Sequence, residues 1–424
     1  MRVESPKPYY DLIVVGGGMV GASFACALSR QLIDTQQKLS VLVVEAVDLE
    51  KASPAAASSA PTDLNQPSFD ARSTALSYGS SRIFERMGLW QNLSEVVTPI
   101  KEIQISDKDR FGSVELNDSE MQLDALGYVV ENRQLGSVLN QEMTQSTGID
   151  FLVPATISAI HPTQQGMRLS IDGASGSHTL NTSLVVLADG GRSPICDQLG
   201  IRRSVEQYKQ HALIANVSFE KPHNNIAFER FTDSGPLALL PLESFADQNR
   251  GSLVWTHAEQ QSAELMAMDD GEMLQKLAER FGNRLGKMLH IGERVCYPLS
   301  LSVAQEQIRP GLVLLGNVAH NLHPVAGQGL NLALRDTEAL VNTLAKAQRE
   351  AKPLGDMSVL QSYLQQQEAD QQRTITFTHY ITRLFSSNAP GKVWLRKFGL
   401  FSIDLVPSIR REFAKQAMGI ATKS

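Results

Sequence analysis

The sequence is poor in cysteine and carries no excess of basic residues. Its three cysteines, Cys26, Cys196 and Cys296, lie far apart and lack the spacing of metal ligands. We interpret them as buried or free thiols in a reducing compartment. The formal net charge of the 424 residues is −6, and no dense face of lysine and arginine is evident. A nucleic-acid partner is therefore not expected, because it would require cations that neutralise phosphates.

Long hydrophobic runs are also missing. The first apolar segment, Tyr9 to Val15, is about as long as one strand, and no segment is long enough to span a bilayer. The N-terminus shows neither the pattern of a signal peptide nor an Arg/Ser-rich transit sequence. We therefore expect a cytoplasmic protein, with any membrane attachment peripheral at the inner membrane. No Gly-x-Ser-x-Gly elbow is present, which argues against a serine hydrolase.

The N-terminal residues have the pattern of a βαβ unit. The β-branched run Tyr9 to Val15 predicts a strand buried on both faces. Apolar residues at helical spacing predict a helix from Met19 to about Ile33, and Ser40 to Ala46 predicts a second buried strand. The segment Lys51 to Ser68 is rich in alanine, serine and proline, so we expect a mobile surface loop there.

The buried-strand pattern returns at Ser183 to Ala188 and at Gly311 to Leu315. The region between these two segments has a different pattern of hydrophobic residues. That region contains hairpin-like segments and a predicted helix near Asp270 to Gly282. We therefore expect an α/β fold in which a discontinuous Rossmann-like domain carries an inserted β-rich substrate domain. The expected pieces are 1–85, 125–200 and 295–345 for the nucleotide-binding domain, 86–124 and 201–294 for the substrate domain, and 346–424 for a helical C-terminal region.

Glycines at the first strand-to-helix turn match a dinucleotide-binding fingerprint. Gly16 permits the tight turn, Gly18 lets the backbone approach a pyrophosphate, and Gly21 lets helix and strand pack closely. The helix N-terminus then offers free N–H groups to the phosphates. Glu45 ends the second strand 24 residues beyond Gly21, where a carboxylate would accept hydrogen bonds from the adenosine ribose. This fingerprint does not distinguish FAD from NAD, since both carry the same adenosine diphosphate half.

Four motifs give the chain a specific resemblance to a known family. They are Gly16 to Gly21, Phe69 to Leu76, Asp189 to Ser193 and Gly316 to Asp336. With them the chain resembles the class A flavoprotein aromatic hydroxylases, which implies an FAD-binding domain of the para-hydroxybenzoate hydroxylase type. It is most similar to the branch that acts on polyprenylated phenols in ubiquinone biosynthesis. Within that branch, Phe228 to Thr232 and Gly235 to Pro241 resemble the 2-octaprenyl-6-methoxyphenol hydroxylases.

The resemblance assigns several residues of the first half of the chain to the cofactor. Arg72 is implied to contact the adenosine and phosphate side of FAD, with a surface salt bridge as its alternative role. Asn132 is implied to reach the cofactor with its polar side chain. Asp189 and Gly190 belong to a motif that serves both FAD and NADPH, the transient reductant. The sequence departs from the family there, because Cys196 stands where that motif usually ends in arginine.

The distal motif is implied to close over the ribityl and isoalloxazine end of FAD. Asn317 stands where the wider family has aspartate, and its amide oxygen can still accept hydrogen bonds from ribityl hydroxyls. The helix beginning near Leu330 is expected to aim its positive end at the flavin ring. His320 and His323 supply only two ligands, so no metal site is expected. The other cofactor residues of this motif are Pro324, Gly327, Gly329 and Asn331.

The activity implied by the resemblance is hydroxylation of 2-polyprenyl-6-methoxyphenol by NADPH and dioxygen through a flavin hydroperoxide. The protein must hold the phenol ring near the flavin and exclude water. No catalytic acid or base is assigned by the sequence. The expected pocket residues are Pro324, Gly327, Leu239 and Pro241, although an ordinary buried strand explains the last two equally well.

Alternative functions share parts of this pattern. A related hydroxylase acting at another ring carbon would show the same motifs, whereas an FAD-dependent dehydrogenase or amine oxidase would share only the N-terminal fingerprint. A non-enzymatic scaffold would use the nucleotide for stability alone.

The expected partners are the polyprenylphenol, dioxygen, other ubiquinone-biosynthesis proteins and a further copy of the chain. The apolar stretch from Ile381 to Val406, punctuated by lysine and arginine, fits either docking at an anionic membrane or packing on protein.

Overall fold

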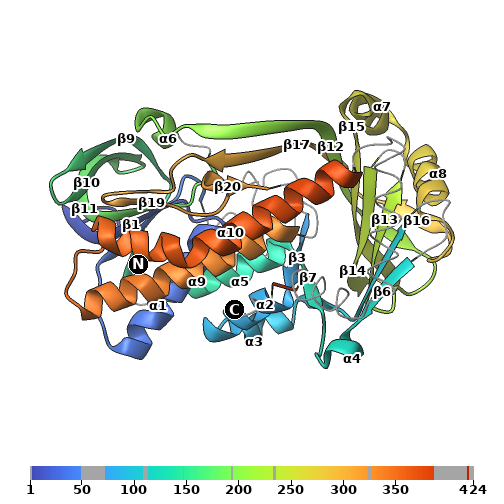
Figure 1. Cartoon of the computed structure of the whole chain (residues 1–424), viewed down its shortest axis with the longest axis horizontal. Coiled ribbons are helices and arrows are strands. Elements are labelled where there is room, and N and C mark those ends of the chain that lie inside the picture. The colour runs from blue at the N-terminus through green and yellow to red at the C-terminus, as the bar shows by residue number, and fades with distance from the viewer. Residues whose placement is uncertain are drawn as a thin grey trace.

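The computed structural model shows an elongated molecule with one sheet-rich half at each end and helices along one face between them (Figure 1). The predicted loop Lys51 to Ser68 lies outside the described residues. The described part of the chain forms three sheets, of eight, nine and three strands. The structure describes residues 2–48, 72–107, 113–146, 148–191, 194–232, 235–322, 327–385 and 418–419.

The predicted βαβ unit forms the centre of the eight-stranded sheet. β1 (Tyr9–Val15) pairs in parallel with β2 (Val41–Val44) on one side and with β11 (Gly176–Leu187) on the other. From Leu12 to Val15 the successive side chains of β1 alternate between two separate hydrophobic cores, which explains why this part of the strand is apolar without interruption. The other strands of this sheet are β8 (Ile149–Leu152), β9 (Ala155–Thr163), β10 (Gly166–Gly173), β18 (Ile308–Arg309) and β19 (Leu312–Leu314).

Four long helices, with two shorter ones given below, contribute to one hydrophobic core against the eight-stranded sheet. Helix α1 (Met19–Thr35) contacts both α5 (Asn132–Gln145) and α9 (Gln328–Arg349), and α9 in turn contacts α10 (Met357–Phe385). Their apolar side chains share a core with β1 and β2. Figure 1 shows α10 running along the outer face of α9 from this half of the molecule toward the other.

The nine-stranded sheet forms the β-rich half that the sequence predicts as the substrate domain. Helices α7 (Ser262–Ala267) and α8 (Asp270–Phe281) cover one of its faces and enclose a separate core with it. The other face is left for the cavity described below. The strands are β5 (Glu102–Asp107), β6 (Ser113–Asn117), β12 (Arg203–Phe219), β13 (Ile226–Thr232), β14 (Gly235–Phe245), β15 (Gln248–Ala258), β16 (Met288–Ile291), β17 (Val295–Ala304) and β20 (His320–Asn321).

A small three-stranded sheet lies between the two large ones (Figure 1). β7 (Gly127–Glu131) pairs antiparallel with both β3 (Ser73–Ser77) and β4 (Val97–Ile100). The end of β3 leads directly into a helix, and β7 leads directly into α5. The remaining short helices are α2 (Tyr78–Arg86), α3 (Trp90–Ser94), α4 (Asp118–Met121), α6 (Ile195–Gln198), η2 (Glu259–Gln261) and η3 (Gly316–Val318).

Strand pairing refines the expected domain boundaries at one point. The sequence assigns residue 295 to the nucleotide-binding domain, yet β17 begins there and pairs with β12 along the nine-stranded sheet. Long strands of this sheet thus run back toward the nucleotide-binding half (Figure 1). We propose the division that the sequence suggests, with the third piece of the nucleotide-binding domain beginning after β17.

The C-terminal region is described only in part. It is helical through α10, which ends at Phe385, whereas most of the apolar stretch from Ile381 to Val406 lies outside the described residues. Farther on, Met418 is buried, and its carbonyl accepts a hydrogen bond from the Gly79 N–H of α2 (2.9 Å). At this point the C-terminal region packs on the protein itself.

Candidate active site

A cavity of about 1000 Å³ lies where the three sheets meet. One end is formed by the β1–α1 turn and the end of β2, and the other by the open face of the nine-stranded sheet. A volume of this size is at the upper end of the usual range for ligand sites, which suits a dinucleotide together with a second molecule. The predicted site residues that line it are Gly16, Gly18, Glu45, Arg72, Asn132, Asp189, Gly190, Asn317, Gly327, Gly329 and Leu330.

The glycine-rich turn presents an uncapped helix N-terminus to the cavity. Gly18 is the N-cap residue of α1, no side chain caps this helix, and its first turn contains no acidic residue. Its first N–H groups therefore remain available to an anion, and the helix dipole favours negative charge there. The backbone at Gly16 has φ +100°, a conformation that glycine adopts readily. These features fit the pyrophosphate of FAD.

Glu45 is held beside this turn by backbone groups. Its carboxylate is almost fully buried and accepts hydrogen bonds from the N–H of Gly17 (2.5 Å) and of Val47 (2.8 Å). Both bonds fix the side chain at the end of β2 while it still lines the cavity. This is the location at which a carboxylate can receive the adenosine ribose hydroxyls.

Gly21 does not line the cavity but makes the close contact of helix with strand. A Cβ atom at this position would lie 1.9 Å from the carbonyl oxygen of Gly16. This agrees with the role that the sequence predicts for Gly21, which is to let α1 pack closely against the preceding turn. It acts on the cofactor site through the position of α1.

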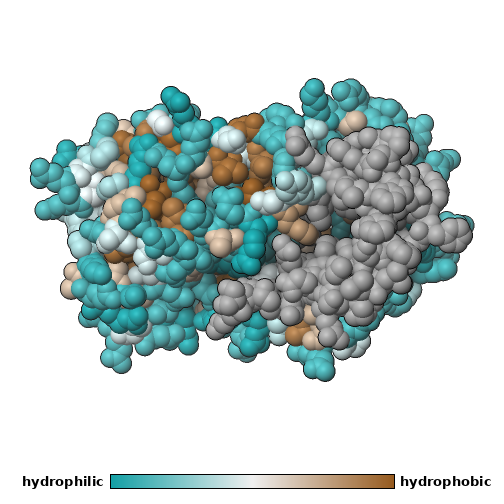
Figure 2. Space-filling model, in the orientation of Figure 1, coloured by the Kyte–Doolittle hydropathy of each residue, from teal (hydrophilic) through white to brown (hydrophobic). Residues whose placement is uncertain are grey.

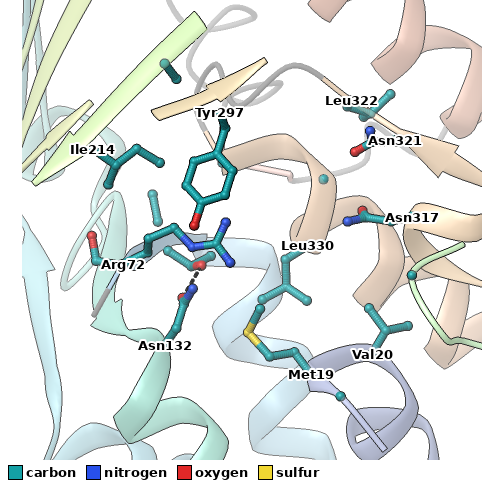
Figure 3. Close-up of a pocket in the computed structure, with 18 of the residues that line it drawn as sticks. Met19, Val20, Arg72, Asn132, Ile214, Tyr297, Asn317, Asn321, Leu322 and Leu330 are labelled. Carbon is teal, nitrogen blue, oxygen red and sulfur yellow. Dashed lines mark hydrogen bonds between the residues drawn. The ribbon is translucent and has the colours of Figure 1, made fainter. Parts of the chain in front are cut away.

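Arg72 and Asn132 meet at the middle of the cavity. Figure 3 shows the Arg72 side chain extending between Asn132 and the ring of Tyr297. The guanidinium carbon lies 4.7 Å from the ring centroid, a cation–π distance. The Asn132 amide oxygen accepts a hydrogen bond from Thr74 Oγ1 (2.7 Å), and its backbone N–H donates to the Arg72 carbonyl (2.7 Å). Arg72 therefore points into the cavity, which favours the cofactor role over an exposed salt bridge.

The Asp189–Gly190 turn lies close to the β1–α1 turn. The Asp189 carboxylate accepts a hydrogen bond from the Gly191 N–H (2.8 Å), which closes a tight turn at the end of β11. Near this turn, Cys196 is buried and its thiol lies close to the guanidinium of Arg203, a residue of β12. Arg203 also donates to the Val318 carbonyl (2.7 Å). A cation from another strand thus stands beside the position where the family motif has arginine.

The distal motif brings a second uncapped helix N-terminus to the cavity. Gly327 is the N-cap of α9 at φ +63°, no side chain caps this helix, and its first turn contains no acidic residue. Gly329 and Leu330 line the cavity beside Asn317, as the sequence predicts. A positive helix end at this place fits the electron-rich edge of a flavin ring. His323 and Pro324 lie outside the described residues.

Asn331 supports the site from behind and does not line the cavity. Its amide oxygen accepts from the Ser77 N–H (2.9 Å) and from Ser80 Oγ (2.7 Å). Its amide nitrogen donates to the carbonyls of Ala75 (2.9 Å) and Gly327 (2.8 Å). Because these four protein groups occupy the amide, the expected role of Asn331 as a cofactor contact is corrected. Its side chain instead holds β3 and the start of α9 together through hydrogen bonds.

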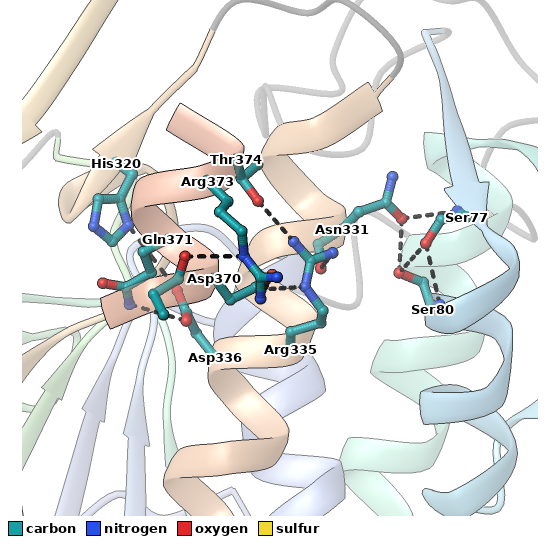
Figure 4. A network of polar contacts seen from close by, with 11 residues as sticks. Ser77, Ser80, His320, Asn331, Arg335, Asp336, Asp370, Gln371, Arg373 and Thr374 are labelled. Atoms are coloured by element: carbon teal, nitrogen blue, oxygen red, sulfur yellow. Dashed lines mark hydrogen bonds and ion pairs between the residues drawn. The ribbon is translucent and has the colours of Figure 1, made fainter. Parts of the chain in front are cut away.

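His320, one of the two histidines of the distal motif, faces a buried aspartate. Its Nδ1 lies 4.0 Å from Asp336 Oδ2, and Asp336 Oδ1 accepts from Gln371 Nε2 (3.0 Å) (Figure 4). Burial raises the pKa of Asp336 to about 7 and lowers the pKa of His320 to about 4. Among the described residues, no group of three or more His, Cys, Asp or Glu side chains is placed to hold a metal ion.

Leu239 and Pro241 were expected to line the substrate pocket, and this expectation is wrong. Leu239 packs into the core beneath α8, and neither residue is among those that line the cavity. Side chains alternate along β14, so its cavity face carries Pro236, Ala238 and Leu240 instead. The sequence pattern identifies the right strand but not which of its faces is open.

The site also contains residues that the sequence analysis did not assign. Tyr297 of β17 and Thr74 of β3 make the contacts with Arg72 and Asn132 given above. Glu229 of β13 lines the substrate end of the cavity. Glu229 stands within a segment quoted for the resemblance, and an acidic residue in a largely apolar strand is the one signal that could have marked it.

This arrangement defines an FAD-dependent monooxygenase of the para-hydroxybenzoate hydroxylase type, and comparison with known proteins agrees. The family model described as "FAD binding domain" matches residues 9–378, so the chain belongs to that family. The fold resembles p-nitrophenol 4-monooxygenase PnpA from Pseudomonas putida, with a TM-score of 0.76 and 15% identity over 98% of this chain and 100% of that one. It also resembles PqsL of Pseudomonas aeruginosa, with a TM-score of 0.74 and 21% identity over 93% and 100%.

Proteins of similar sequence narrow the group further. Ubiquinone hydroxylase UbiL of Rhodospirillum rubrum is 31% identical, over 96% of this chain and 89% of that protein. The 3-demethoxyubiquinol 3-hydroxylase of Escherichia coli is 28% identical, over 97% of this chain and 98% of that protein. The mitochondrial ubiquinone biosynthesis monooxygenase COQ6 of Mus musculus is 28% identical, over 99% and 92%. NADPH is the reductant typical of this family.

The Asn317 side chain provides a test of the distal end of the site. We expect Asn317→Asp to retain FAD, because the two side chains are isosteric and both accept the ribityl hydrogen bonds. Asn317→Leu should weaken FAD binding about tenfold, which corresponds to about 1.4 kcal/mol for the lost acceptor. Fluorescence titration of apoprotein with FAD measures both. Normal affinity in the leucine variant would show that Asn317 only forms the turn.

Proposed function

We propose that this protein hydroxylates a polyprenylated phenol, 2-polyprenyl-6-methoxyphenol, in ubiquinone biosynthesis, by the route that the sequence resemblance implies. The single observation that carries the proposal is a continuous cavity that joins an FAD cradle to the apolar face of the nine-stranded sheet. When bound, FAD supplies the activation of dioxygen. The chain itself supplies the walls that hold the phenol ring and exclude water.

The substrate end of the cavity suits a phenol with an apolar substituent. Its walls carry Ile103 of β5, Ala227 of β13 and Leu240 of β14, with Thr256 and Ser300 as the nearby hydroxyl groups. Such a lining favours an apolar ring and tail over a charged substrate. The names of the similar proteins, which refer to ubiquinone and its demethoxy precursor, support the same substrate class.

Hydroxylation at another carbon of the same ring is the second candidate. The Escherichia coli protein named 3-demethoxyubiquinol 3-hydroxylase matches this chain over nearly its whole length, so the motifs shared with it do not select one carbon. The orientation of the ring in the cavity would decide between the two.

A polyprenyl substrate dissolves in lipid, so we propose that the protein works in the cytoplasm at the surface of the inner membrane. Among the described residues, no helix is long and apolar enough to cross a bilayer. Figure 2 shows apolar groups gathered between hydrophilic ones on one face of the molecule, and Val205 and Tyr380 are among the exposed large apolar side chains.

The C-terminal region also contributes to stability. Since Met418 packs on α2, removal of the C-terminal residues from Lys392 onward should lower the thermal stability.

The purified holoenzyme tests the function directly. We expect a yellow protein that oxidises NADPH slowly alone and faster with 2-methoxyphenol bearing a short prenyl chain at carbon 6. Mass spectrometry and product standards identify the hydroxylated carbon. A colourless protein would favour the scaffold, and a yellow protein whose NADPH oxidation no phenol stimulates would contradict the hydroxylase.

A further inference from the structure

Glu229 places a carboxyl group in the substrate half of the cavity. It lies on β13, opposite Ala238 of β14 and beside Ile105 of β5. Strand alternation places Ala227 and Glu229 on the same face of β13, and both line the cavity, whereas the neighbouring Phe228 packs into the core beneath α8 and also reaches the cavity wall. Within the described part of the chain, no hydrogen-bond or ion-pair partner is recorded for its carboxylate. Glu229 is half-buried, and a carboxylate that is partly removed from water is costly unless a ligand satisfies it.

The electrostatic surroundings of Glu229 are set by burial and not by a neighbouring charge. Glu229 is half-buried at the cavity wall, and the desolvation of its carboxyl group raises the pKa of Glu229 to about 7. The neighbouring strands face the cavity here with apolar residues such as Ile103 and Ala238. The other titratable side chains among the described lining residues are Glu45, Arg72, Asp189 and Tyr297.

We propose that Glu229 binds the phenolic hydroxyl of the substrate and accepts its proton. The inference rests on the proposed function, because it requires a phenol in this end of the cavity. The O–H bond of the phenol breaks, the proton passes to the Glu229 carboxylate, and the electron pair stays on the phenolate oxygen. One proton and no electron moves, so the step needs no oxidant. The same oxygen takes the proton back when the hydroxylated ring regains its aromaticity.

The environment of Glu229 suits this task. A phenol has a pKa near 10 and an ordinary glutamate about 4.3, a gap of nearly six units that makes glutamate a weak base toward phenol. The raised pKa of Glu229 reduces that gap by about half. A phenolate donates electrons into its ring far better than a phenol, and ring carbon attack on an electrophilic oxygen requires such donation. The base therefore accelerates the reaction that the cofactor enables.

Substrate binding without turnover gives the first test. The probe is 2-methoxyphenol with a short prenyl chain at carbon 6, added to oxidised holoenzyme at pH 8 in the absence of NADPH. We expect the ultraviolet absorption of the phenol bound to the wild type to shift to longer wavelength, because its hydroxyl donates to a carboxylate, and we expect a smaller shift for Glu229→Gln. The glutamine side chain has the same shape and hydrogen-bonding reach but cannot accept the proton.

Steady-state kinetics gives the second test. For the wild type, hydroxylation kcat/KM should rise as the pH increases through about 7, because the base must be deprotonated to act. Glu229→Gln should lower product formation about 100-fold, the lower range for general base catalysis, and should remove this rise. Glu229→Asp should restore part of both. The matched control is Glu243→Gln, at an exposed position of β14.

The outcomes separate this inference from the proposed function. A shifted phenol spectrum without turnover in the wild type would overturn the hydroxylase function alone, whereas equal spectra for the phenol bound to the wild type and to Glu229→Gln would overturn the role of Glu229. An unchanged pH profile in Glu229→Gln would also overturn it. Loss of FAD or of thermal stability in that variant would do the same, because Glu229 would then be structural.

Discussion

Gly21→Val is expected to yield protein without FAD and with much reduced stability. The first added carbon would lie 1.9 Å from the Gly16 carbonyl oxygen, where the backbone of α1 meets the backbone of the β1–α1 turn. Helix and strand must therefore separate, which costs about 3 kcal/mol or more for a crowded core position. The displaced helix would carry its N-terminal N–H groups away from the pyrophosphate position. Flavin absorbance and thermal unfolding of the purified variant measure the two effects.

A pair of alanine variants distinguishes this contact from a general effect of removing glycine. Gly21→Ala places one carbon at the same close contact, so it should also lose most of its FAD. Gly271 lies in the first turn of α8, where an added Cβ would meet only the Asp269 side chain, at 3.3 Å. Gly271→Ala should retain FAD and be as stable as the wild type, or more stable. Full flavin content in Gly21→Ala would refute the assigned role.

The N-terminal nucleotide-binding unit could be predicted because the residues that determine its structure are close together in the sequence. The apolar run at the end of β1, the glycine spacing after it and the acid at the end of β2 all lie within 45 residues, and each has one structural explanation. The structure confirms the elements, with α1 extending to Thr35. The distal motif could be placed only through the resemblance, because nothing in residues 316–331 alone says that they fold back onto the first turn.

The substrate half was less predictable because its residues depend on pairing across distant strands. Leu239 and Leu240 are alike in sequence, and only the docking of α8 decides that Leu239 is buried in the core while Leu240 lines the cavity. Asn331 reads as a motif residue aimed at a ligand, yet its four partners come from β3, α2 and the start of α9. Arg203 at the start of β12 approaches Cys196 of α6, and no local sequence pattern predicts this contact.

The second large expected effect concerns Asp336 on α9, whose variant Asp336→Asn should be more stable than the wild type above pH 7. The carboxyl group is fully buried, and Oδ2 lacks a hydrogen-bond partner among the described residues. It is surrounded by His320 of β20, by Gln371 and Tyr363 of α10, and by the Arg335–Asp370 ion pair (Figure 4). An asparagine would keep the acceptor for Gln371 and bury no charge.

The direction of the pH dependence follows from the two buried groups. The pKa of Asp336 is raised to about 7 in the folded protein, so the folded state binds more protons than the unfolded state between about pH 4 and pH 7. Its contribution to stability therefore falls as the pH rises through that window. The pKa of His320 is lowered to about 4, so its contribution rises from about pH 4 to 6.5. The two contributions offset each other over most of this range.

Asp336→Asn should reveal the histidine contribution alone. The free energy of unfolding would then rise from about pH 4 to 6.5 and stay high, whereas that of the wild type would change little. Above pH 7 the variant should exceed the wild type by up to about 4 kcal/mol, taking 1.36 kcal/mol for each of about three pKa units. Urea unfolding at pH 5, 7 and 8.5 measures the difference, with Asp247→Asn in an exposed turn as the control. Equal pH profiles for Asp336→Asn and the wild type would mean that the buried carboxyl group carries no such cost.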